Sequence, residues 1–166
     1  YEGRFIMITD AAINIAPDVE TQIGIVENAL PVARALGVEC PKVAVLSAVE
    51  NVTDKMPSTV TAREIAERGV EGCVISCPLA LDGAISMESV KHKAIKDPVA
   101  GQADILLVPF IEIGNVLYKA CSYIAGKTMA STICGASCPV IITSRADTPD
   151  SKYYSILMAV LRCLKA

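Results

Sequence analysis

A cluster of polar side chains follows the apolar run at 139–143. Ser144 and Arg145 come directly after this run, and Asp147 and Asp150 follow closely. A guanidinium fixed beside a strand end offers two parallel hydrogen bonds that suit phosphate, which lysine cannot reproduce. The carboxylates could hold that guanidinium, cap the helix expected to follow, or accept a proton as a general base. These residue types indicate an anion site at the end of a buried strand, where α/β proteins bind ligands.

A second candidate lies where Gly114 and Asn115 open another apolar-periodic segment. Backbone N–H groups at a helix start are free to bind an anion, and Lys119 follows one turn further on the same face. An ordinary turn beside a solvated lysine is the competing interpretation. The chain contains neither GxGxxG nor GxxxxGK[ST], so neither standard nucleotide-binding motif applies.

Apolar runs alternate with helical patterns along the chain. The runs expected as strands are 4–9, 42–47, 73–76, 104–109, 128–133 and 139–143. Helices are expected near 18–36, 58–67, 87–93, 114–124 and 149–164. We expect Pro31 to kink or interrupt the first of these. Continuous β-branched runs predict strands covered on both faces, so the fold class is α/β with a largely parallel sheet flanked by helices.

Polar or turn residues follow most of these strands, beginning with Asp10 after the first. Parallel strands end at one edge of a sheet, so these side chains could line one crevice. The link between the last two strands is too short for a parallel crossover, so that pair is expected to be antiparallel or to lie in different sheets. The last helix is expected to bury an apolar stripe made of Tyr153, Ile156, Leu157, Val160 and Leu164.

The totals exclude several classes of protein. A chain of 166 residues with 52% hydrophobic residues can bury a core and is not disordered. A net charge of -3 and 4% aromatic residues argue against a nucleic-acid surface. No apolar stretch reaches the ~18 residues of a membrane span. The seven cysteines and one histidine lack the spacing of common zinc sites, so we expect no metal, and thiols buried in a reducing cytoplasm.

Two segments carry a specific resemblance: DPVAGQADILLVP-x4-GNVLYKA at 97–120 and PVIITSRAD at 139–147. They closely resemble phosphotransacylases, the phosphate acetyl/butyryltransferase family, and above all its phosphate butyryltransferase branch. FIMITDAAINIAPD at 5–18 and LALDGAIS at 79–86 fit the same family. The resemblance implies two α/β lobes like those of isocitrate and isopropylmalate dehydrogenases, with the active site between them.

Because such enzymes are about twice this length, the chain is expected to be their C-terminal portion. One lobe would lie at about 1–135, and residues 136–166 would return to an N-terminal lobe outside this sequence. The chain alone is expected to be inactive, because half of the cleft would be absent. The resemblance also implies a homodimer; from the cysteines and the composition we expect a cytoplasmic protein with no nucleic-acid or membrane partner.

The resemblance implies a reaction in which a short-chain acyl-CoA, butyryl or branched, and orthophosphate give acyl phosphate and coenzyme A, reversibly. Coenzyme A is then a substrate, and no cofactor is implied. By motif, Ser144 would orient the thiol or stabilise the oxyanion, and Arg145 would hold phosphate. Asp147 and Asp150 compete for the role of base. The residues assigned to substrate binding are Asp10, Phe110, Gly114, Asn115 and Lys119.

Phe110 departs from the family pattern, which has aspartate at this place. The apolar side chain would enlarge acyl affinity or mark impaired chemistry, so a non-catalytic acyl-CoA or phosphate-binding module is the alternative function. A metal-dependent dehydrogenase of the related fold would need clustered carboxylates, and Asp10, Asp82 and Asp104 are not spaced for such a site.

Overall fold

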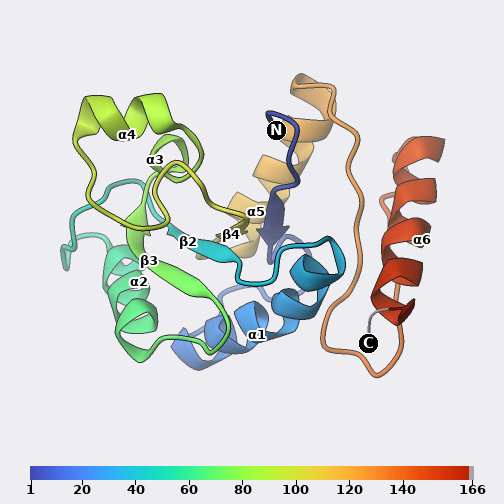
Figure 1. Ribbon diagram of the computed structural model, residues 1–166, viewed down its shortest axis with the longest axis horizontal. Coiled ribbons are helices and arrows are strands. Elements are labelled where there is room, and N and C mark those ends of the chain that lie inside the picture. The colour runs from blue at the N-terminus through green and yellow to red at the C-terminus, as the bar shows by residue number, and fades with distance from the viewer. Residues whose placement is uncertain (165–166) are drawn as a thin grey trace.

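The computed structural model describes residues 1–164 and contains one four-stranded parallel sheet (Figure 1). The strands lie in the order β1-β4-β2-β3. Their bounds are β1 (Met7–Thr9), β4 (Ile105–Leu107), β2 (Lys42–Leu46) and β3 (Val74–Leu79). Each neighbouring pair is parallel, so all four carboxyl ends lie at one edge. The predicted α/β fold with a parallel sheet is confirmed.

Helices cover both faces of this sheet, with α1 and α2 below it and α3, α4 and α5 above it in the view of Figure 1. Their bounds are α1 (Val19–Ala35), α2 (Pro57–Arg68), α3 (Leu81–Ile85), α4 (Met87–Lys93), α5 (Ile111–Lys119) with a π-helical turn (Ala120–Ile124), and α6 (Pro149–Leu164). Helix α1 runs through Pro31, so the expected interruption is wrong. Pro31 is exposed, while the core holds Leu30 and Val32 on either side of it.

The core has two halves because strand side chains alternate between the faces of the sheet. Toward α1 and α2, one half contains Val43, Val45, Ile105 and Leu107 with Val26, Ala29, Leu30, Ala62 and Ile65. Toward α3 and α5, the other contains Ala44, Leu46, Leu106 and Val108, with Leu117 of α5 against them. Burial on both faces explains why β2 and β4 read as continuous apolar runs.

The runs 128–133 and 139–143 are not strands of the sheet, so this expectation is wrong. They meet in one antiparallel bridge, in which the Ile133 N–H donates to the Val140 carbonyl at 2.8 Å. The antiparallel relation expected for this pair is therefore confirmed at that single position. Ile141 and Ile142 are 37% and 57% exposed. Apolar character had predicted burial, but no described strand lies beside these two residues to form a ladder.

The cysteines also differ from the expectation of buried thiols. All seven are free; Cys40, Cys77, Cys138 and Cys163 are exposed, and the other three are half-buried. Cys40 lies two residues before β2 and Cys73 directly before β3, so both lie at the margin of the sheet rather than inside the core.

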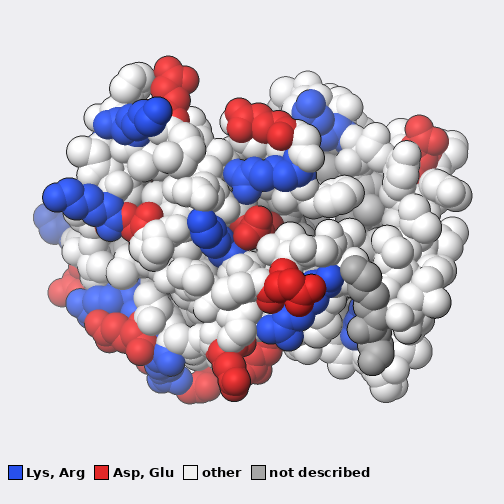
Figure 2. Space-filling model, viewed as in Figure 1, with Lys and Arg blue, Asp and Glu red and all other residues white. Residues whose placement is uncertain are grey.

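Helix α6 buries the face opposite to the one that its apolar stripe predicts. Ser151, Ser155 and Ala159, spaced four residues apart, are the buried positions. The exposed side chains on the other face are Tyr153, Tyr154, Ile156, Leu157, Val160 and Leu164. Figure 2 shows this part of the surface, at the right, to be nearly free of charge. The predicted apolar stripe of α6 is present, but no other part of the described chain packs over it.

Polar contacts hold α6 against the extended segment before it. The Ser155 hydroxyl accepts from the Ser131 N–H at 2.9 Å and donates to the Ser151 carbonyl at 2.7 Å. Nearer the end of the helix, the Arg162 guanidinium donates to the carbonyls of Ile133 and Ala136, each at 3.4 Å. Hydrogen bonds thus replace strand pairing as the means of fixing residues 129–136.

The first prediction concerns Ser155, which is 1% exposed. Replacement by alanine leaves the Ser131 N–H without its acceptor, so Ser155→Ala should lower the free energy of unfolding by about 1–3 kcal/mol. Amide hydrogen exchange should be faster at Ser131. Lys152→Ala, an exposed change on the same helix, is the control and should leave that amide unchanged. Equal exchange rates at Ser131 in wild type and Ser155→Ala would contradict this account.

Candidate functional site

The loop after β1 is built around the Asp10 carboxylate. Asp10 Oδ1 accepts from the N–H groups of Ala12 and Ile13 at 2.7 and 3.0 Å. Its Oδ2 accepts from the Asn14 backbone N–H at 2.8 Å and from the Asn14 side-chain amide at 2.7 Å. Both oxygens therefore shape the loop at the carboxyl edge of the sheet. Direct contact of Asp10 with substrate stays a prediction.

These hydrogen bonds stabilise the ionised form of Asp10. Burial by itself would raise the pKa of this carboxyl, but the N–H groups of Ala12, Asn14 and Ile13 and the Asn14 amide outweigh it. The net effect is a pKa below its ordinary value of 3.8. Asp10 is consequently an anion at neutral pH.

Helix α5 packs against this loop through Gly114. A Cβ at this position would lie 2.6 Å from the Asp10 carbonyl oxygen and 2.9 Å from the Ala11 Cα, both backbone atoms. Only glycine fits so close an approach without displacing the loop. The helix begins at Ile111 with Phe110 as its N-cap, and the Gly114 N–H donates to the Phe110 carbonyl. The predicted start at Gly114 is therefore wrong, and the Gly114 N–H is not free for an anion.

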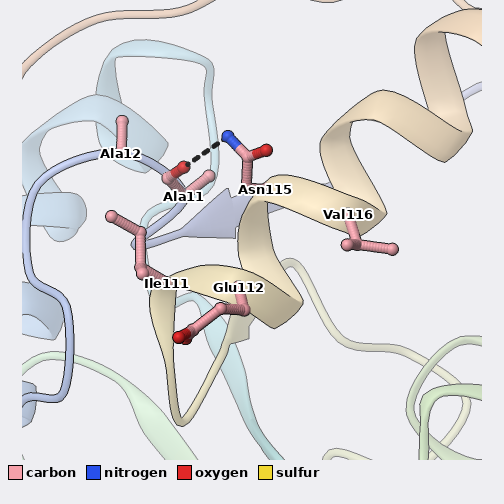
Figure 3. A pocket seen from close by; sticks show the side chains of 6 residues that line it. All are labelled: Ala11, Ala12, Ile111, Glu112, Asn115 and Val116. Carbon is pink, nitrogen blue, oxygen red and sulfur yellow. Dashed lines mark hydrogen bonds between the residues drawn. The ribbon is translucent and has the colours of Figure 1, made fainter.

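Asn115 crosses from α5 to the same loop. Its side-chain amide donates to the Ala11 carbonyl at 3.4 Å, the bond drawn in Figure 3. A shallow hollow of about 420 Å³ lies here, lined by Ala11, Ala12, Ile111, Glu112, Asn115 and Val116 (Figure 3). The structure thus brings together Asp10, Gly114 and Asn115, as the sequence predicted.

Tyr118 joins the same helix to the polar segment after residue 143. Its hydroxyl donates to Asp147 Oδ1 at 2.9 Å, and the Ser144 N–H donates to Asp147 Oδ2 at 2.7 Å. Burial and the Asp147 carboxylate raise the pKa of Tyr118 despite an opposing hydrogen bond with Ser131, so the hydroxyl remains a donor. Sequence reasoning missed Tyr118; its place three residues after Asn115 on one helix face was the available signal.

The two aspartates of this segment differ in their surroundings. Asp147 is 9% exposed and both its oxygens are occupied, whereas Asp150 is exposed in the first turn of α6. Neither makes the capping bond considered from the sequence, because the Thr148 hydroxyl accepts from the Ser151 N–H at 3.2 Å. Asp147 fixes the turn, and Asp150 keeps an open carboxylate.

The remaining candidates lie on exposed surface. Ser144 and Arg145 are exposed on the turn that Asp147 holds, and Arg145 makes no ion pair with any residue from 1 to 164. Phe110 is 43% exposed at the start of α5, and Lys119 ends that helix. No helix in the described range is both long and apolar enough to cross a bilayer.

A parallel sheet with helices on both faces defines an α/β protein, and in this class ligands commonly bind beyond the carboxyl ends of the strands, where the Asp10 loop lies. The chain belongs to the family described as "Phosphate acetyl/butaryl transferase", whose model matches residues 1–160. The family predicted from the two sequence segments is confirmed.

Several known proteins are similar to this chain. A probable phosphate butyryltransferase of Bacillus subtilis is 48% identical over 161 residues, which cover 95% of this chain and 54% of that protein. A phosphate acetyltransferase of Thermotoga maritima is 43% identical over 162 residues, or 95% of this chain and 55% of that protein. The crystal structure of a branched-chain phosphotransacylase from Enterococcus faecalis matches with a TM-score of 0.88 and 44% identity, covering 93% of this chain and 57% of that one. The chain spans about half the length of these relatives.

The second prediction tests the close approach at Gly114. Gly114→Ala should lower the free energy of unfolding by about 1–3 kcal/mol, since the added methyl group would have to displace backbone atoms of Asp10 and Ala11. The matched control is Gly24→Ala in α1, where a Cβ meets nothing within 4 Å. That change should instead stabilise by about 0.5–1 kcal/mol, as alanine does inside a helix. Urea unfolding of both variants measures the difference, and losses of equal size would refute the argument.

The third prediction follows from the lowered pKa of Asp10. The ionised carboxylate contributes stability above its ordinary pKa of 3.8, and this contribution is lost as pH falls through the lower folded-state pKa. Asp10→Asn, which replaces an acceptor by a donor, should therefore destabilise the protein at neutral pH. The deficit relative to wild type should shrink on acidification below that value. Urea unfolding across pH measures it, with the exposed Asp54→Asn as control; a deficit independent of pH would contradict the assignment.

Proposed function

We propose that the protein transfers a short acyl group between coenzyme A and phosphate. Family membership and the names of the relatives, phosphate butyryltransferase and phosphate acetyltransferase, support this activity. The observation that carries the proposal is the Ser144–Arg145 turn. Asp147 accepts hydrogen bonds from Tyr118 and from the Ser144 N–H and so fixes the turn, while the side chains of Ser144 and Arg145 remain exposed.

Arg145 is suited to bind phosphate because its guanidinium forms no ion pair with any carboxylate among residues 1–164. A guanidinium already paired with a carboxylate would have to exchange that partner for the ligand. The Asp147 carboxylate, which could have taken this role, is engaged by Tyr118 and Ser144 instead. Arg145 can therefore offer a bidentate contact to a phosphate group.

In the proposed reaction the coenzyme A thiol loses its proton, and the thiolate attacks the carbonyl carbon of the acyl phosphate. The tetrahedral intermediate then expels phosphate and leaves acyl-CoA; the reverse reaction follows the same steps. The Ser144 hydroxyl would stabilise the oxyanion or orient the thiol, and Arg145 would hold the leaving phosphate. Asp150 is the better candidate for the base, since its carboxylate is exposed and Asp147 is fully hydrogen-bonded.

Butyryl or branched short acyl groups are the proposed substrates. The Enterococcus faecalis relative is a branched-chain phosphotransacylase, and Phe110 and Ile113 expose apolar surface at the start of α5. Gly114, Asn115 and Lys119 on the same helix are proposed to contact the substrate, with Asp10 shaping the adjoining loop.

We also propose the wider setting expected from the sequence. Residues 136–166 would contact an N-terminal lobe, consistent with the uncovered apolar face of α6. A homodimer acting in the cytoplasm on soluble substrates would complete the arrangement.

Release of free thiol from butyryl-CoA in the presence of phosphate tests the function. The assay compares the 166-residue chain with a protein that carries it at the full length of its relatives. Turnover by the long form, with acyl phosphate as the second product, is the expected result. Coenzyme A binding without turnover would overturn the proposal in favour of a binding module.

The fourth prediction is that Arg145→Lys impairs the enzyme at full length. Loss of a bidentate charge-assisted contact costs about 1.5–3 kcal/mol, or roughly ten- to a hundred-fold in kcat or in affinity for phosphate. A surface ion pair worth about 0–1 kcal/mol would leave both almost unchanged. Steady-state kinetics at varied phosphate concentration distinguishes the two cases. A melting curve checks that the variant is folded, and Arg63→Lys on α2 is the matched control. Normal kcat and phosphate KM in Arg145→Lys would remove Arg145 from the site.

A further inference from the structure

Two cysteines lie side by side at the amino edge of the sheet, away from the proposed site. Cys40 and Cys73 precede the neighbouring parallel strands β2 and β3, in which Lys42 is paired with Val74. The Val74 N–H donates to the Pro41 carbonyl at 3.0 Å. Continuing this register backwards puts Pro41 opposite Cys73 and Cys40 opposite Gly72, so Cys40 and Cys73 are diagonal neighbours on the two segments. With strands about 4.8 Å apart and a rise of about 3.3 Å per residue, such diagonal neighbours have Cα atoms about 6 Å apart, within the separations of about 4.4–6.8 Å that disulfides span.

The Arg34 guanidinium fastens these two segments together. Its Nε donates to the Glu39 carbonyl and its Nη2 to the Gly72 carbonyl, each at 3.3 Å. Glu39 and Gly72 are the residues immediately before Cys40 and Cys73. The two cysteines are thus enclosed between the Arg34 contacts on one side and the ladder bond of Val74 on the other.

The thiols differ in a way that suits sequential oxidation. Cys40 is exposed, whereas Cys73 is half-buried and its thiol donates to the Val70 carbonyl at 3.4 Å. Burial and the neighbouring Cys40 raise the pKa of Cys73, against the opposing effect of Arg34. The electrostatic influence of Cys40 and Arg34 on Cys73 agrees with the proximity that the strand register gives.

We propose that Cys40 and Cys73 form a reversible redox pair, oxidised to a disulfide by hydroperoxides. The Cys40 thiolate attacks the peroxide oxygen, which gives a sulfenic acid and releases water after proton transfer. The Cys73 sulfur then attacks the Cys40 sulfur, loses its proton and expels a second water. One peroxide is reduced and two thiols become one disulfide. A dithiol such as dithiothreitol returns both thiols by exchange.

The bond would tie β2 to β3 at the amino edge of the sheet. It would close a loop containing all of α2, and so restrict the unfolded chain more than the folded one. The expected consequence is a change in stability on oxidation. A native disulfide of this kind should raise Tm by roughly 5–10 °C, reversed by reductant.

The test is mild hydrogen peroxide treatment of the folded chain, followed by alkylation, trypsin digestion and mass spectrometry. The expected product links the peptide 35–42 to the peptide 69–91, lighter than the sum of the two by two hydrogen atoms. The second peptide also contains Cys77, so Cys77→Ser is the matched control and should keep the link. Cys40→Ser and Cys73→Ser should each abolish it.

A second variant tests the part played by Arg34. Arg34→Ala removes both carbonyl contacts and should slow formation of the linked peptide roughly tenfold, since hydrogen bonds from a charged group hold the segments together. Arg63→Ala, another exposed helical arginine, should form the link at the wild-type rate. Absence of the linked peptide in folded wild type, its loss in Cys77→Ser, or a link formed faster in urea than in the native fold would each overturn the proposal.

Discussion

The contact between Gly114 and the Asp10 carbonyl sets the position of α5, and the proposed site depends on that helix. Without a side chain at residue 114, the helix lies against backbone atoms of the loop after β1. The loop can receive the helix because the Asp10 carboxylate has already fixed its N–H groups. One close approach and one carboxylate thereby fix the position of α5, and with it the positions of Asn115 and Tyr118.

Tyr118 extends this arrangement to a segment that has no place in the sheet. Residues 139–143 pair with no strand of the sheet, yet the turn after them is held by the Asp147 carboxylate between the Tyr118 hydroxyl and the Ser144 N–H. A buried carboxylate with both oxygens satisfied is a rigid support. The two aspartates therefore differ in role. Asp147 supports the turn because each of its oxygens accepts a hydrogen bond, whereas the Asp150 carboxylate is exposed.

Helix α6 has a polar face that binds the preceding segment and an apolar face that is exposed. Its serines and Arg162 hydrogen-bond to the preceding segment, while its tyrosines and aliphatic side chains remain uncovered. An apolar surface of this kind is a usual mark of contact with another unit. Relatives of about twice this length are consistent with such a unit, which is why we propose an adjoining lobe.

The sequence by itself determined the α/β class, the four core strands, the family, and the grouping of Asp10, Gly114 and Asn115, because these follow from hydrophobic periodicity and local motifs. Only the tertiary structure decided that α5 begins at Ile111, that Tyr118 holds Asp147 across 29 residues, and that α6 buries serines rather than its apolar stripe. Periodicity tells which side chains favour burial, but not which surface is available to bury them. Contacts such as Arg34 with Gly72, 38 residues apart, arise only when the sheet brings two distant turns together.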